Sequence, residues 1–178
     1  MDKIRKAVFI DGSFLFHHSQ NIQIKIDYFK LKNLLVSEDE FLTSIAYYTA
    51  LPKEADMEQR HRSFIKVLKK EVRIKVKSVP LLKVASNSVT SEGGGPRYSK
   101  GEDILLAGEM VRGAALNHYD IAVLVTGDGD FVPAVRIVQE LGKPVVIASF
   151  RSSLNHTLDL EGSKVIYLDE YIKEIRLP

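Results

Sequence analysis

Residues 121–131 read IAVLVTGDGDF, and this stretch decides the fold class. Its first five residues are apolar and largely β-branched, which predicts a strand buried on both faces. The segment that follows holds two aspartates, Asp128 and Asp130, separated by one glycine. Acidic residues directly after a buried strand are typical of a parallel sheet whose carboxyl edge carries a ligand site.

Further strand-length runs occur along the chain on both sides of this stretch. Residues 7–10 and 144–148 are apolar on both faces and are predicted to be inner strands, and residues 41–48 and 165–167 are also predicted to be strands. Residues 72–77 alternate between apolar and cationic side chains, and their three cations suit an edge strand that is protected from pairing with other chains.

Helical spacing of apolar residues separates these predicted strands. It predicts helices over residues 57–70, 103–116, 131–141 and 169–175. The alternation of strands and helices predicts an α/β fold, a three-layer α/β/α sandwich with a mostly parallel, Rossmann-like central sheet.

Composition limits the class of protein further. The 178 residues suit one domain over residues 1–178, and 45% hydrophobic with 27% charged residues excludes a mainly disordered chain. The absence of cysteine excludes disulfide scaffolds, thiolate metal sites and cysteine nucleophiles. Every apolar run is strand-sized, and the first residues are interpreted as a strand and not as a signal peptide, so we expect a cytoplasmic protein without a membrane span.

Four aspartates stand at element boundaries that this fold could bring to one edge. Asp11 follows the first predicted strand, Asp128 and Asp130 follow the strand at 121–125, and Asp103 opens the helix at 103–116. Each also has a structural interpretation: Asp11 in a turn, Asp130 as a helix cap, and Asp103 as a first-turn acid favoured by the helix dipole. If they converge, their repulsion favours a divalent cation, and oxygen ligands alone suit Mg²⁺ or Mn²⁺. Attack of a metal-activated water on a phosphodiester is the chemistry that such a site favours.

Three segments carry a family resemblance: VFIDGS (8–13), KGED (100–103) and TGDGDFVP (126–133), supported by LGKPV (141–145) and SSL (152–154). Together they resemble the NYN group of the PIN-like nucleases, in particular its LabA-like branch. The resemblance implies a PIN-like fold and metal-dependent ribonuclease activity on RNA with Mg²⁺ or Mn²⁺. By motif match, it implies a catalytic metal site at four aspartates, with Glu109 as a further candidate ligand: Asp11, Asp103, Asp128 and Asp130.

Two positions depart from the family pattern. Phe14 stands where the family usually has asparagine, and Glu109 stands where a further aspartate often occurs. Phe14 motivates an alternative function, a non-catalytic RNA- or protein-binding module on a degenerate PIN-like scaffold. Adhesion-type metal-binding domains and haloacid-dehalogenase-type phosphatases fit less well, because Leu15 and Ser13 replace residues that their motifs require.

Several polar residues near the four aspartates are candidate substrate contacts. The hydroxyls of Ser13 and Thr126 could bond phosphate or a metal-bound water, while Lys100 and Arg97 could contact a scissile phosphate. Arg97 and Lys100 belong to a glycine-rich stretch, residues 86–100, which is interpreted either as a solvent-exposed loop or as a flexible flap over substrate. His17 and His18 are interpreted as surface or packing residues rather than ligands.

Charge is distributed unevenly in a chain whose net charge is only +2. Residues 60–77 hold eight Lys or Arg and one Glu, so this basic segment carries +7 and the rest of the chain carries −5. Such a segment could bind an RNA backbone, or it could be a solvated helix face followed by a protected edge strand. The sequence leaves both interpretations open, and it leaves the assembly open between a monomer and a homodimer.

Overall fold

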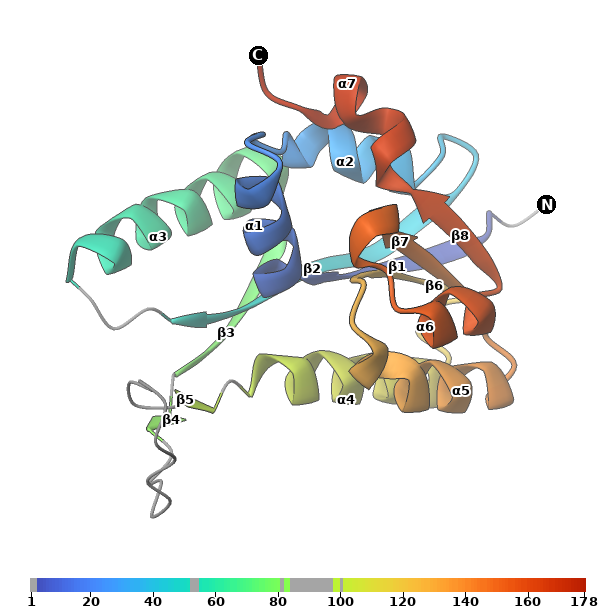
Figure 1. Ribbon diagram of the computed structural model, residues 1–178. Helices are drawn as coiled ribbons and strands as arrows, with labels where there is room; N and C mark the ends of the chain where they lie inside the picture. Colours follow the sequence, from blue (N-terminus) through green and yellow to red (C-terminus); the bar gives the residue numbers. More distant parts are fainter. Residues whose placement is uncertain (1–2, 52–54, 81, 84–97, 100) are drawn as a thin grey trace.

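A six-stranded parallel sheet forms the centre of the protein (Figure 1). The computed structural model describes residues 3–51, 55–80, 82–83, 98–99 and 101–178. The strand order is β3-β2-β1-β6-β7-β8, and every neighbouring pair in it is parallel. The strands are β1 (Arg5–Asp11), β2 (Phe41–Leu51), β3 (Lys75–Pro80), β6 (Ile121–Val125), β7 (Val145–Ser149) and β8 (Lys164–Tyr167). A separate antiparallel pair joins β4 (Leu82–Lys83) to β5 (Tyr98–Ser99).

Helices cover both faces of the sheet, which confirms the predicted three-layer α/β fold (Figure 1). One face carries α4 (Glu102–Ala115), α5 (Val132–Glu140) and α6 (His156–Glu161). The other carries α1 (Gly12–Asn21), α2 (Tyr28–Leu35), α3 (Ala55–Val67) and α7 (Ile172–Ile175). Short turns of helix complete the chain: η1 (Leu68–Val72), η2 (Gly129–Phe131), η3 (Arg151–Ser153) and η4 (Leu168–Tyr171).

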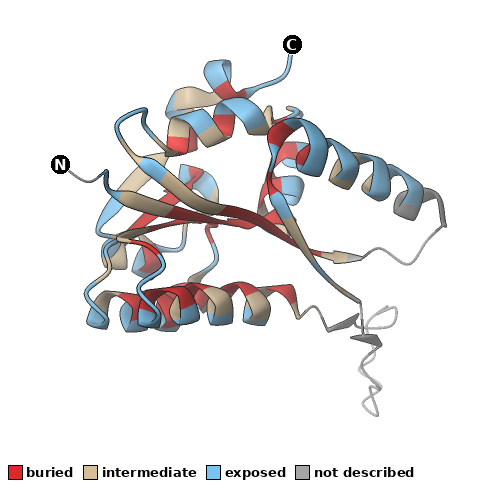
Figure 2. Ribbon diagram, turned by 180° about the vertical axis from the view of Figure 1, so that it is seen from behind, coloured by how far each residue is buried: buried red, intermediate tan, exposed pale blue. Residues whose placement is uncertain are grey.

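The alternation of side chains along β1 builds two hydrophobic cores. Ala7 and Phe9 pack in the core under α4 and α5, while Val8 and Ile10 pack in the core under α1 and α2. All four are at most 5% exposed. Figure 2 shows the consequence, buried strands between helices whose outer faces are exposed. Burial on both faces is what the apolar run at residues 7–10 predicts.

The structure corrects the predicted strand at residues 72–77. Helix α3 passes into the π-helical turn η1, which ends at Arg73 with a left-handed backbone, φ +60°. The N–H groups of Arg73 and Ile74 both donate to the carbonyl of Leu68, so these residues cannot join the sheet. The edge strand β3 therefore begins at Lys75 and holds two of the three predicted cations, Lys75 and Lys77.

The carboxyl edge of the sheet between β1 and β6, where the strand order reverses, is named the crevice. The chain adds β2 and β3 on one side of β1 and adds β6, β7 and β8 on the other, so the order reverses between β1 and β6. In open α/β sheets, ligands bind at the carboxyl ends of the strands where this reversal occurs. Asp11 ends β1, and Thr126 and Asp128 follow β6, so this crevice is the place to look for a site.

Two further expectations from the sequence concern a membrane span and the glycine-rich loop. No helix among the described residues is long and apolar enough to cross a membrane. The predicted loop at residues 86–100 lies outside the described residues except for Tyr98–Ser99, and so do Arg97 and Lys100.

Candidate functional site

Asp11 links β1 to β6 across the crevice. As the N-cap of α1, it accepts the Phe14 N–H at Oδ1, 2.9 Å, and it accepts the Thr126 hydroxyl at Oδ2, 2.8 Å. Its side chain lies deep, since the residue is 4% exposed and Thr126 is fully buried. Asp11 is thus a helix N-cap and not the simple turn that the sequence offered, and a cap alone needs no such burial.

Negative charge is costly at Asp11. Burial raises the pKa of this carboxyl, and the charges of Asp128 and Glu102 raise it further. The hydrogen bonds from Phe14 and Thr126 lower the pKa but do not offset these effects. A bound cation would stabilise the ionised form, because an opposite charge nearby favours it.

Glu102 is a site residue that the sequence analysis missed. It opens α4, is 1% exposed, and accepts the Ser13 hydroxyl at Oε1, 3.0 Å. Its other oxygen, Oε2, is buried and accepts no hydrogen bond from the described residues. A buried carboxylate oxygen without a donor is expensive, and a cation or an ordered water would satisfy it.

Asp103, the predicted ligand on this helix, lies beside Glu102 in the first turn of α4. It is half-buried, and its position as a first-turn acid is the structural interpretation that the sequence offered. The helical phase could have identified Glu102 instead: Leu106, Met110 and Gly113 follow it on the buried face of α4. Glu102 is therefore the acid that this face turns inward, while a role for Asp103 stays a prediction.

Asp128 and Asp130 are exposed at the rim of the crevice. The N–H of Asp128 donates to the Thr126 hydroxyl oxygen, 3.2 Å, which connects Asp128 to Asp11 through one side chain. Asp128 Oδ1 accepts the Asp130 N–H, 2.9 Å, and so caps η2. The structural interpretation of Asp130 as a helix cap is wrong, because α5 is preceded by Phe131 and has no side-chain cap.

Glu109 belongs to a different set of contacts. Its carboxylate accepts a hydrogen bond from the hydroxyl of Tyr48, 2.7 Å, and forms an ion pair with the ammonium group of Lys77, 3.0 Å. Burial raises the pKa of Glu109, but these two donors outweigh it and hold the pKa below its ordinary value. The contacts tie α4 to β2 and β3, a structural function that accounts for this carboxylate.

The two predicted hydroxyl contacts both serve carboxylates here. Ser13 donates to Glu102 and Thr126 donates to Asp11, so each hydroxyl orients an acid. Each hydroxyl oxygen can still accept a hydrogen bond, but its one proton is already donated to a carboxylate. Contact of these hydroxyls with phosphate therefore stays a prediction, as does contact of Arg97 and Lys100, which lie outside the described residues.

The donor chemistry of the crevice fits a hard divalent cation. Asp11, Glu102 and Asp128 supply only carboxylate oxygens, which suit Mg²⁺ or Mn²⁺ better than zinc. The unsatisfied oxygen of Glu102 could accept a bond from a cation or an ordered water, and a cation beside Asp11 would oppose the effect of burial on its pKa. Within the described ranges, however, no three acidic or histidine side chains lie in an arrangement that could hold a metal ion.

Comparisons with known proteins agree with this fold. The solved structure of a protein of unknown function from Vibrio parahaemolyticus is similar at a TM-score of 0.71 and 19% identity, over 98% of this chain and 97% of that one. No curated protein is significantly similar in sequence. The family model named NYN domain matches residues 5–169, from the start of β1 to η4, and so includes every acid of the crevice. The chain therefore belongs to the NYN domain family, which is part of the PIN-like nuclease superfamily.

Proposed function

We propose that this protein is a metal-dependent ribonuclease that hydrolyses phosphodiester bonds of RNA. The observation that carries the proposal is a group of three carboxylates, buried Asp11 and Glu102 with exposed Asp128 beside them, where the strand order reverses. Membership of a family in the PIN-like nuclease superfamily supports the same reaction. Within that family, the segment TGDGDFVP at 126–133 favours the LabA-like branch.

The acids of the crevice would together bind Mg²⁺ or Mn²⁺. Asp11, Glu102 and Asp128 are the candidate ligands, and Asp103 and Asp130 are their neighbours in sequence. The cation would act as a Lewis acid and lower the pKa of a water. Ser13 and Thr126 hold the Glu102 and Asp11 carboxylates in fixed orientations, and Asp130 at the rim is suited to orient the attacking water.

Cleavage of single-stranded and structured RNA with Mg²⁺ or Mn²⁺ tests the proposal. EDTA should abolish cleavage, and Asp128→Asn should lower it by about 100-fold or more, because a cation contributes several kcal/mol to such reactions. Asparagine keeps an oxygen to accept the Asp130 N–H, so the fold should persist. Asp39→Asn, an exposed aspartate before β2, is the matched control and should cleave like the wild type. Metal-independent cleavage, or full activity in Asp128→Asn, would contradict the proposal.

The second candidate function is a non-catalytic RNA- or protein-binding module. Phe14 favours it, because the family usually has asparagine at this position, and so does the lack of a three-ligand group among the described residues. This candidate expects RNA binding without turnover under every metal condition. Robust metal-dependent cleavage in the assay above excludes it.

The basic segment at residues 60–77 gives a prediction that both candidates share if RNA is the partner. Lys69 and Lys70 of η1 are exposed, and neither makes an ion pair within the part of the chain that the structure describes. The double change Lys69→Gln and Lys70→Gln should weaken RNA binding and reduce the slope of log affinity against log salt by about 1.4, or about 0.7 per lost phosphate contact. Fluorescence anisotropy over a salt series measures this slope.

The control for the basic segment is the double change Lys25→Gln and Lys30→Gln, two exposed lysines near and on α2. It removes the same charge from residues outside the basic segment. Equal salt slopes for the two double variants would show that the basic segment is only a solvated surface.

A further inference from the structure

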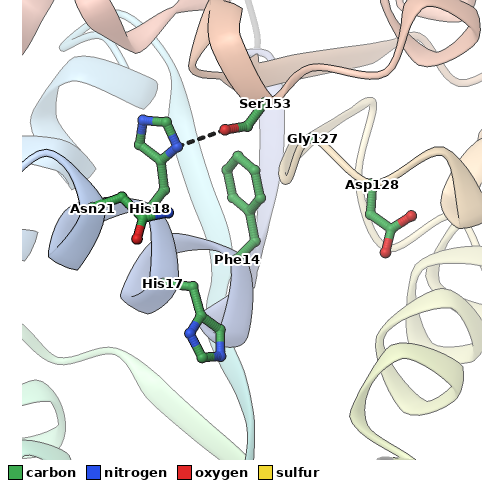
Figure 3. A pocket seen from close by; sticks show the side chains of 7 residues that line it. All are labelled: Phe14, His17, His18, Asn21, Gly127, Asp128 and Ser153. Atoms are coloured by element: carbon green, nitrogen blue, oxygen red, sulfur yellow. Dashed lines mark hydrogen bonds between the residues drawn. The ribbon is translucent and has the colours of Figure 1, made fainter. Parts of the chain in front are cut away.

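A pocket of about 280 Å³ opens beside Asp128, between α1 and the segment after β6 (Figure 3). Its walls come from the carboxyl ends of three adjacent strands: α1 follows β1, Gly127 and Asp128 follow β6, and η3 follows β7. Seven residues line it: Phe14, His17, His18, Asn21, Gly127, Asp128 and Ser153. Because the Asp128 N–H donates to the Thr126 hydroxyl, which in turn donates to Asp11, the pocket adjoins the acidic crevice.

The pocket walls are fixed by packing and hydrogen bonds. His18 stacks on Phe150 with ring centroids 4.0 Å apart, and its Nδ1 lies 2.6 Å from the Ser153 hydroxyl. The Phe14 ring stacks near His18, 6.1 Å between centroids, and stands between His18 and Gly127 in Figure 3. The N–H of Asn155 donates to the Gly127 carbonyl, 2.9 Å, which joins the segments after β6 and β7. The pocket is thus largely formed before any ligand arrives.

The lining suits a flat, neutral heterocycle better than a phosphate. Phe14 is half-buried and contributes an aromatic ring to the wall, while exposed His17 and Asn21 offer an imidazole and an amide that can donate or accept hydrogen bonds. Among the described residues, no lysine or arginine lines the pocket, and Asp128 at its edge repels anions. Burial lowers the pKa of His18 against the opposing charge of Asp169, which disfavours a positive charge on this ring.

We infer that this pocket binds one unpaired nucleobase of an RNA strand whose backbone passes the acids of the crevice. The inference rests on the proposed function and deepens it, because a base can enter only when it is unpaired, which makes single-stranded RNA the substrate. The volume lies just below the range for ligand pockets, about 300 to 1,000 Å³, so it suits one small group such as a single base. Stacking of a base on an aromatic side chain is sequence-tolerant, since every base has a π-face.

The chain has no tryptophan, so Phe14→Trp places a single reporter in the pocket. In EDTA, a single-stranded RNA of about 12 nucleotides should quench its emission to saturation, at the concentrations where anisotropy reports binding. An abasic strand of the same length should bind without quenching. Phe29→Trp, at an exposed phenylalanine of α2, is the matched control and should not be quenched. His17→Trp, at an exposed residue of the same pocket, repeats the test if the larger ring disturbs packing at residue 14.

Affinity gives an independent measure. Phe14→Leu should weaken binding of the RNA by about 5- to 150-fold and leave binding of the abasic strand unchanged, whereas Phe14→Tyr should keep wild-type affinity. Equal losses for both strands, or RNA binding without quenching in both tryptophan variants, would overturn the pocket. Absence of RNA binding by the wild type would overturn the pocket as well. Quenching by adenosine monophosphate at concentrations as low as those of RNA would overturn the RNA strand as the ligand and assign a free nucleotide in its place.

The outcomes for the pocket and for the nuclease are separable, because the quenching assay contains no metal. Quenching with no cleavage under any metal condition keeps the pocket and removes the ribonuclease proposal. Cleavage with no quenching keeps the ribonuclease and removes the pocket.

Discussion

Asp11→Asn should lower RNA cleavage by about 1,000-fold or more, while the Tm measured in EDTA stays equal to the wild-type value or rises. The loss of activity is expected because this carboxylate is the central acid of the crevice, and a bound cation contributes several kcal/mol. The fold should tolerate the change, since the asparagine oxygen can still accept the Phe14 N–H and its amide can donate to the Thr126 hydroxyl oxygen. Loss of cleavage without loss of Tm would thus show that Asp11 serves catalysis and is not needed for the fold.

The pH dependence of stability follows from the raised pKa of Asp11. A raised pKa means that the folded state binds the proton more tightly than the unfolded state, so the group favours folding at low pH. This contribution declines as pH rises from the ordinary aspartate value, 3.8, through the raised value, and above that window the charge costs stability. Asp11→Asn lacks this decline, so its Tm advantage in EDTA should be present at neutral pH and absent in acid.

A matched control exists at the start of the next helix. Asp27 is the N-cap of α2 and accepts hydrogen bonds from the N–H groups of Phe29 and Lys30. It caps a different helix from Asp11 and is not among the acids of the crevice. Asp27→Asn should keep full cleavage. Added Mn²⁺ should raise the Tm of the wild type and of Asp27→Asn, and it should raise the Tm of Asp11→Asn and Glu102→Gln much less. Equal Mn²⁺ shifts in all four proteins would contradict a cation at these carboxylates.

The fold was predictable from local patterns because its three central strands, β1, β6 and β7, are largely buried. Residues 7–10 and 121–125 are apolar on both faces, and such runs are characteristic of parallel strands between two helical layers. The turn at η1 was not predictable in this way, because Arg73 adopts a left-handed backbone that its residue type does not favour. Its conformation depends on two hydrogen bonds to the carbonyl of Leu68.

The candidate site was predictable in part. Asp11 ends β1, and Asp128 and Asp130 lie shortly after β6, so strand boundaries alone bring them to one edge of the sheet. Glu102 lies at a helix end, where two adjacent acids differ only in the face they occupy, and choosing between them requires the phase of α4 relative to the sheet. The aromatic pocket required tertiary packing, since Phe14, Gly127 and Ser153 meet only after three strands have assembled.

Gly127→Ala should destabilise the protein by about 3 kcal/mol and lower its Tm by about 6 to 12 °C. A β-carbon at this position would lie 2.1 Å from the Ser153 carbonyl oxygen and 2.7 Å from the Phe14 ring. The oxygen belongs to the backbone, so relief requires movement of η3 or of the segment after β6. That segment carries both Thr126 and Asp128, and cleavage should therefore fall together with stability.

Gly108→Ala is the opposite case and serves as the control. Gly108 lies within α4, and a β-carbon there would meet nothing within 4 Å. Because alanine favours a helix interior over glycine, this variant should gain about 0.5 to 1 kcal/mol and keep full cleavage. Urea unfolding of both variants measures the difference. A Gly127→Ala protein as stable as Gly108→Ala would mean that the segments after β6 and β7 do not pack together as described. These segments would then not form a wall beside the acids of the crevice.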